Sequence, residues 1–245
     1  MLENHQLYLT VLSDLKLWLP NKKLDVNILK TTIDDKSLSP KARYEINSFY
    51  RCEMLDTVLA RLDKTSKMVK RRFYKQKGDN KRDVAIEHHI SQYHMYCAYY
   101  QSGLDVSLRL VNAILDLNYP LNLNLRFKVC NSGYVKKTKL GKVLLDLEKQ
   151  TNAYREIKNL LLHEGKGSRP PISLQRPSEK EIRRFSKEYG YKRDVVVSGL
   201  EHIYTVFDSN KLVETMDKER NDLELTFRRL MDELLPHYIC IHRQF

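Results

Sequence analysis

A repeat of apolar and aromatic side chains runs through residues 82–118 without a proline to interrupt it. The intervals are three or four residues, which is the spacing that places side chains on one face of an α-helix. This pattern predicts one long helix whose face would pack against other helices. Gly103 within it indicates either a close crossing of two long helices or a bend. The repeat comprises Ile86, Ile90, Tyr93, Cys97, Tyr100, Leu104, Leu108, Val111 and Leu115.

Helical spacing recurs along the rest of the chain, so we expect residues 1–245 to form a single all-α domain, a helical bundle. Ser39 and Pro40 are typical of an N-cap and a first helical position, and apolar residues continue the helix up to a basic run. Only 8 glycines and 7 prolines are present, which is sparse for a loop-rich β protein. Further helices are predicted over residues 3–18, 136–163 (one or two helices), 178–189, 193–207 and 209–235.

Residues 121–130 differ from the remainder, because apolar and polar side chains alternate there with the period of a strand. A single short strand would have no partner in a helical protein. We therefore predict an extended connector.

No segment reaches the roughly 20 apolar residues that a membrane span requires. The amino terminus lacks the apolar core of a signal peptide, so we expect a soluble, cytoplasmic protein with no membrane partner. The four cysteines have no metal-type spacing and are predicted to be reduced and buried; they are Cys52, Cys97, Cys130 and Cys240.

The chain carries a formal net charge of +12, which favours a polyanionic partner. Nine Lys or Arg fall within residues 64–82, where Phe73 and Tyr74 add rings that can stack on bases. A second basic segment covers residues 166–193. Solvated basic faces are the alternative interpretation of both. The candidate RNA-binding residues are Arg71, Arg72, Lys75, Arg183, Arg184 and Lys187.

A polar stripe is the most informative local pattern. On a helix, Arg155, Asn159 and His163 fall at i, i+4 and i+8, within an arc of about 80°. Apolar residues between them lie largely on the other face. The alternative is structural, since a histidine in the last turn followed by Gly165 is also what a helix C-terminus favours.

The segment Lys158-Asn159-Leu160-Leu161-Leu162-His163 resembles the motif of the HEPN superfamily, which is Arg-Asn-x-x-x-His in one common form. Lys158 stands where the family has Arg, and Arg155 lies one turn earlier, with seven residues before His163. Residues 99–112 are similar to the helix that faces the motif in stand-alone bacterial HEPN proteins. The resemblance covers residues 84–165, with the motif helix at about 150–164, and implies an antiparallel bundle with additional flanking helices.

The resemblance implies a metal-independent endoribonuclease of a bacterial defence or toxin–antitoxin system. Two motifs would meet across a homodimer, with His163 as acid or base and Lys158 or Arg155 as the phosphate cation. Asn159 would position the phosphate or the imidazole, and Asp105 could hold the histidine tautomer or pair with the cation. No cofactor is implied, and an antitoxin or other regulatory protein is a possible partner.

Two other functions remain open from the sequence. Lys158 in place of Arg favours a catalytically silent module that binds RNA or regulates, because lysine lacks the planar fork that suits phosphate. The second is a helical scaffold whose basic faces meet an acidic protein. The histidines at 88, 89 and 94 form no metal motif, and the chain has no phosphate-binding, dinucleotide-binding or nucleophile-elbow motif.

Overall fold

The computed structural model describes residues 2–17, 38–70, 81–152, 154, 179–189 and 193–245. All regular secondary structure within these ranges is helical, which confirms the all-α class. None of the helices in them is both long enough and apolar enough to cross a membrane.

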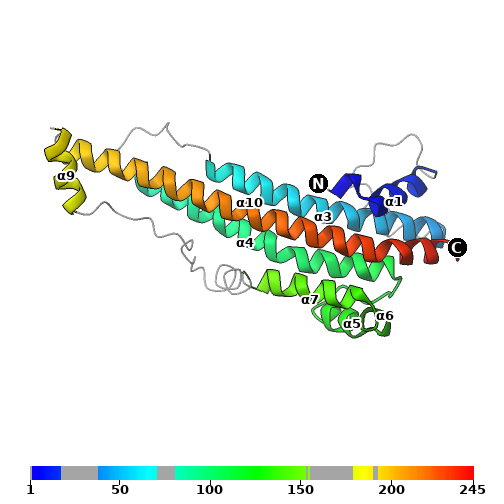
Figure 1. Cartoon of the computed structure of the whole chain (residues 1–245). Helices are drawn as coiled ribbons and strands as arrows, with labels where there is room; N and C mark the ends of the chain where they lie inside the picture. The colour runs from blue at the N-terminus through cyan, green and yellow to red at the C-terminus, as the bar shows by residue number, and fades with distance from the viewer. Residues whose placement is uncertain (1, 18–37, 71–80, 153, 155–178, 190–192) are drawn as a thin grey trace.

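Four helices form the body of the molecule: α3 (Pro40–Lys70), α4 (Lys81–Ile114), α7 (Lys139–Asn152) and α10 (Arg193–His242). Successive members run in opposite directions, as the colour gradient of Figure 1 shows, so the bundle is antiparallel. Helix α4 packs against α3, α7 and α10, and its largest fully buried side chain is Tyr96. The predicted cap of α3 is present, since Ser39 Oγ accepts a hydrogen bond from the Ala42 N–H at 3.2 Å.

Gly103 marks a close approach between α4 and α10. A Cβ atom at this position would lie 3.1 Å from Cζ of Phe227, which is fully buried. The glycine inside the long apolar repeat therefore serves helix packing, which was one of the two outcomes predicted for it.

The amino-terminal helix α1 (Gln6–Lys16), with the short 3₁₀ helix Leu2–Asn4 before it, packs on α3 and on the carboxyl end of α10. His5 caps it, because His5 Nδ1 accepts a hydrogen bond from the Leu7 N–H at 3.1 Å. Tyr238 and His242 of α10 close the contact. Tyr238 donates a hydrogen bond to Asp14 at 3.0 Å, and His242 lies 2.7 Å from the buried carboxylate of Glu45.

The prediction of an extended connector over residues 121–130 is wrong for its second half, which is helix α5 (Leu125–Asn131). Leu125 and Val129 are one helical turn apart and both are buried, whereas Phe127 between them is exposed. Over so few residues, a strand with alternating burial and a helix that buries only positions i and i+4 produce the same sequence pattern. Helix α6 (Gly133–Lys136) follows, and the two short helices lead into α7.

The separate helices predicted over residues 193–207 and 209–235 are also wrong, because α10 continues unbroken from Arg193 to His242. Ser209 and Asn210 are weak helix formers whose cost, below about 1 kcal/mol each, the packing of a long helix overrides. Pro236 lies inside the helix, where proline removes one hydrogen bond at a cost of about 3 kcal/mol. Tyr238, two residues after Pro236, is fully buried, and its burial offsets that cost.

The basic helix predicted at residues 178–189 is present as α9 (Glu179–Tyr189), which packs on the amino-terminal part of α10 at the end of the molecule remote from α5 and α6 (Figure 1). The cysteine prediction holds for Cys52 and Cys97, which are buried, but Cys130 is only half-buried and Cys240 is exposed.

Candidate functional site

The residues predicted to carry the chemistry follow directly on α7. That helix ends at Asn152, and Tyr154 lies in a turn closed by its N–H and the Thr151 carbonyl at 3.2 Å. The predicted motif helix at about 150–164 is thus helical over its first three residues. Its remaining part, with Arg155, Lys158, Asn159 and His163, lies outside the described residues, and so do Arg71, Arg72 and Lys75.

Tyr154 anchors the chain to the bundle immediately before the motif. Its side chain is 8% exposed, and its hydroxyl donates a hydrogen bond to Glu219 Oε2 of α10 at 2.5 Å. Its ring packs on Tyr100 of α4, with the ring centroids 4.9 Å apart, and on the edge of Tyr96. Two of the long helices therefore fix the position of Tyr154, the last described residue before the motif.

Burial shifts the pKa values of the groups around this anchor. Burial, together with the nearby Glu219 carboxylate, raises the pKa values of Tyr96, Tyr100 and Tyr154 far above the ordinary value for tyrosine. Burial also raises the pKa of the Cys97 thiol to about 12 and raises the pKa of Glu219 above its ordinary value of 4.5. Tyrosines and a thiol that stay protonated at neutral pH suit a structural anchor rather than acid–base chemistry.

Glu219 was missed by the sequence analysis, although the sequence contains a signal for it. The apolar stripe of α10 runs through Leu212, Met216, Leu223 and Phe227, and Glu219 occupies the intermediate helical position. A carboxyl group in an apolar stripe needs a buried partner, which here is Tyr154.

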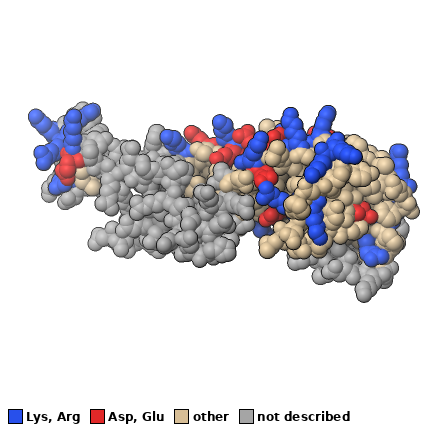
Figure 2. Space-filling model, turned by 90° about the horizontal axis from the view of Figure 1, so that it is seen from below, with Lys and Arg blue, Asp and Glu red and all other residues tan. Residues whose placement is uncertain are grey.

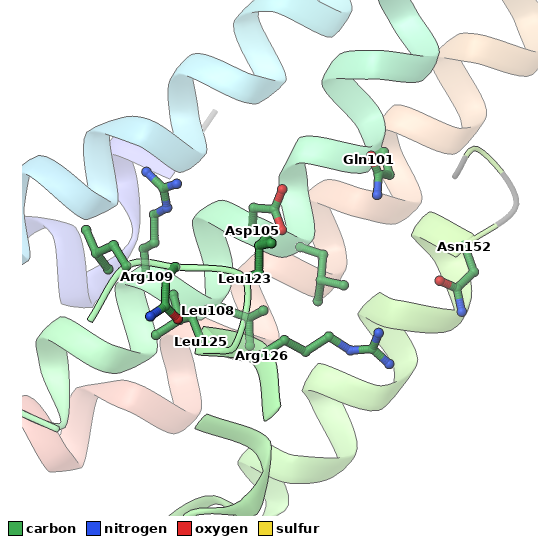
Figure 3. A pocket seen from close by; sticks show the side chains of 11 residues that line it. Gln101, Asp105, Leu108, Arg109, Leu123, Leu125, Arg126 and Asn152 are labelled. Carbon is green, nitrogen blue, oxygen red and sulfur yellow. The ribbon is translucent and has the colours of Figure 1, made fainter. Parts of the chain in front are cut away.

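A cleft of about 550 Å³ lies beside the end of α7 (Figure 3). One wall is α4, the second is formed by the loop before α5 and the start of that helix, and the third is the last residue of α7. The lining residues are Gln101, Leu104, Asp105, Leu108, Arg109, Leu121, Asn122, Leu123, Leu125, Arg126 and Asn152. Because Asn152 is two residues before Tyr154, the motif segment begins at the margin of this cleft.

Asp105, which was predicted as a supporting residue from the facing helix, is exposed and lies in the cleft. Figure 3 shows Arg109 and Arg126 on either side of it. Arg126 forms an ion pair with Glu148 of α7, and Arg109 is close enough to Arg51 that their like charges lower the Arg51 pKa, after the larger effect of burial. Gln101 Oε1 is buried and accepts no hydrogen bond from the described residues. The cleft thus combines the carboxylate of Asp105 with two cations, of which Arg126 is paired with Glu148, over a leucine-lined floor.

The other predicted RNA contacts do not join this cleft. Arg183, Arg184 and Lys187 are exposed on α9, at the far end of the bundle (Figure 1). Any ligand of these three residues would therefore bind at a part of the molecule remote from the cleft.

The described part of the chain holds no cluster of three or more His, Cys, Asp or Glu side chains that could bind a metal ion. Comparisons of the chain with models of known protein families, with curated proteins and with solved structures give no match.

Proposed function

We propose that the protein is a metal-independent, HEPN-type endoribonuclease that acts in the cytoplasm as part of a bacterial defence or toxin–antitoxin system. The observation that carries the proposal is the position of the cleft. Its cations Arg109 and Arg126 and the carboxylate of Asp105 lie where the segment with Lys158, Asn159 and His163 begins. Guanidinium groups suit phosphate ligands, and Arg126 would exchange its ion pair with Glu148 for such a ligand.

The reaction is an attack by the ribose 2′-hydroxyl on the adjacent phosphorus. The bond from phosphorus to the 5′-oxygen breaks, which leaves a 2′,3′-cyclic phosphate and a free 5′-hydroxyl. His163 takes the proton of the attacking hydroxyl or donates one to the leaving oxygen. Lys158 or Arg155 stabilises the charge on the phosphorane oxygens, and Asn159 orients the phosphate. Asp105 holds the imidazole tautomer or pairs with the cation.

The test is cleavage of single-stranded RNA in EDTA by the wild type, His163→Ala and Lys158→Arg. We expect cyclic phosphate ends from the wild type and none from His163→Ala. Lys158→Arg restores the planar guanidinium and should raise the rate, by about 10-fold if one bidentate hydrogen bond is gained. Lys211→Arg at an exposed position of α10 is the matched control and should leave the rate unchanged. Intact RNA in every lane would contradict the proposal.

A catalytically silent RNA-binding module is the second candidate, and Lys158 in the place of the motif Arg is the observation that favours it. It predicts salt-sensitive RNA binding that is equal in the wild type and in His163→Ala, with no cleavage by either. Restored cleavage in Lys158→Arg alone would identify a nuclease fold that has lost its activity through this substitution. Complex formation with an acidic regulatory protein that competing RNA cannot disturb would instead indicate a scaffold.

A further inference from the structure

The end of the bundle formed by residues 121–149, which we call the α5–α7 cap, has an excess of unpaired cations. It contains seven Lys and Arg residues but only two acids, and both acids are in ion pairs: Glu148 with Arg126, and Asp146 with Arg229 of α10 at 3.2 Å. The six lysines are exposed and form no ion pair with any residue that the structure describes. They are Lys128, Lys136, Lys137, Lys139, Lys142 and Lys149.

The same surface exposes large apolar side chains. Phe127 of α5 is 72% exposed and Tyr134 of α6 is 65% exposed, while Leu123 in the preceding loop is fully exposed. Tyr134 meets the ring of His237 edge-on, with centroids 6.0 Å apart, so its orientation is supported from α10. Figure 2 looks at the molecule from the side on which α5–α7 lie and shows blue cations distributed among the tan surface there.

The arrangement of cations and exposed rings on this surface favours one class of partner over another. Arg126 and Lys128 flank Phe127 in the sequence, and Lys136 and Lys137 follow Tyr134 within one helical turn. The cores of protein–protein interfaces are depleted in lysine and are contiguous, so this surface is a poor fit to a protein partner. Isolated exposed rings set among lysines are what single-stranded nucleic acid uses, because bases stack on the rings and the cations neutralise phosphates.

We propose that the α5–α7 cap binds single-stranded RNA and guides it into the cleft. The cap and the cleft share the loop 121–123 and Arg126, so a strand lying over Phe127 and Tyr134 continues to the point where the motif segment begins. The choice of RNA over single-stranded DNA rests on the proposed function. The preference for an unpaired strand rests on the exposed rings, since paired bases are stacked on one another and leave no face free.

Binding is measured by fluorescence anisotropy with the full chain and a labelled single strand of about 12 nucleotides, within the range of site sizes for single-strand modules. The RNA carries 2′-O-methyl groups, so that it cannot be cleaved during the titration. A duplex of the same sequence and the corresponding single-stranded DNA are the comparison ligands. We expect the duplex to bind about 10-fold more weakly than the single strand or worse. A duplex that binds as tightly would overturn the proposal.

Phe127→Ala tests stacking. It should weaken binding of the single strand by about 5- to 100-fold and change binding of the duplex little. Leu225→Ala is the matched control, because Leu225 is a large apolar residue that is 60% exposed on α10. Equal affinities of Phe127→Ala and Leu225→Ala would overturn the proposal. A change from dimer to monomer in Phe127→Ala would also overturn it, since the cap would then be a contact between two copies.

The paired substitution Lys136→Gln/Lys137→Gln tests the phosphate contacts. If both lysines contact phosphates, the slope of log Kd against log salt should fall by about 1.4, at about 0.7 for each contact on a single strand. Lys211→Gln/Lys218→Gln removes the same charge from exposed positions on α10 and should leave the slope as in the wild type. Equal slopes for the two double variants would contradict the assignment of the cap.

The outcomes separate this proposal from the proposed function. Single-strand binding that depends on Phe127, without cleavage in EDTA, would support RNA binding by the cap and contradict the nuclease function. Cleavage that depends on His163, with an affinity for RNA that does not depend on Phe127 or on the lysine pair, would support the nuclease function and contradict RNA binding by the cap. Tighter binding of the single-stranded DNA than of the RNA would reject RNA as the occupant.

Discussion

The hydrogen bond from Tyr154 to Glu219 joins α10 to the chain immediately after α7, at the residue where the motif segment begins. The sequence singled out the segment that begins at Tyr154, and it also places Glu219 on an otherwise apolar stripe. It could not pair the two, because they are 65 positions apart and the pairing depends on how α10 packs against the end of α7. Asp105, which was predicted from the helix opposite the motif, lines the same cleft as Asn152 at the end of α7, and its role stays a prediction.

Replacing Glu219 with Gln should flatten the dependence of stability on pH. The folded-state pKa of Glu219 is raised above 4.5, first by burial. Between 4.5 and the raised value, the folded chain holds a proton that the unfolded chain has released, so the free energy of unfolding decreases as pH rises. Glutamine does not ionise, and its oxygen can still accept the hydrogen bond from Tyr154.

Urea unfolding of the wild type and Glu219→Gln across this pH range is the measurement. We expect the variant to gain stability relative to the wild type as pH rises above 4.5. Glu214→Gln, at an exposed position of the same helix, is the control and should follow the wild type. If the stability difference between the wild type and Glu219→Gln stays constant with pH, the anchor carboxyl does not have a raised pKa.

At the scale of secondary-structure elements, the number of helical turns in the apolar pattern decided between success in α4 and failure in α5. The repeat in α4 extends over many turns, so one helical period was unambiguous. In α5 only Leu125 and Val129 are buried, and those two positions fit a strand pattern equally well. The break predicted within α10 is wrong for a different reason. The low helix propensity near Ser209 costs less free energy than the packing of the whole helix provides.

Gly141 provides a test of how α6 and α7 fit together. A Cβ atom there would lie 2.7 Å from the carbonyl oxygen of Val135, a backbone atom that cannot move aside freely. Alanine improves helix propensity by about 1 kcal/mol, but the crowding costs about 1–3 kcal/mol. We therefore expect Gly141→Ala to lower the free energy of unfolding by up to about 2 kcal/mol.

Gly133 in α6 is the matched control, because a Cβ atom there meets nothing within 4 Å. Gly133→Ala should raise the free energy of unfolding by about 0.5–1 kcal/mol, since alanine restricts the unfolded chain more than glycine does. Both values come from denaturant unfolding at constant temperature. Equal effects of the two substitutions would mean that α6 moves away from α7 at little cost.

At the scale of the whole molecule, the sequence predicted a basic, all-α bundle. It did not predict which part of the surface carries the excess of positive charge. The partners of the two acids in the cap are known only from the fold: Asp146, for example, pairs with Arg229, 83 positions away. Helix α9 also has exposed cations, but it lies at the other end of the bundle (Figure 1). Net charge alone therefore predicts a polyanionic partner without locating its surface.

A composite active site between two copies of the chain makes a prediction about dilution. If cleavage requires a homodimer, as the HEPN resemblance implies, the rate per protomer should fall in proportion to concentration once most of the protein is monomeric. The cap belongs to one copy, so the affinity for the single strand should not change over the same range. Cleavage rates and sedimentation velocity at matched concentrations provide the measurement. A rate per protomer that stays constant while the dimer dissociates would place the whole reaction within a single copy.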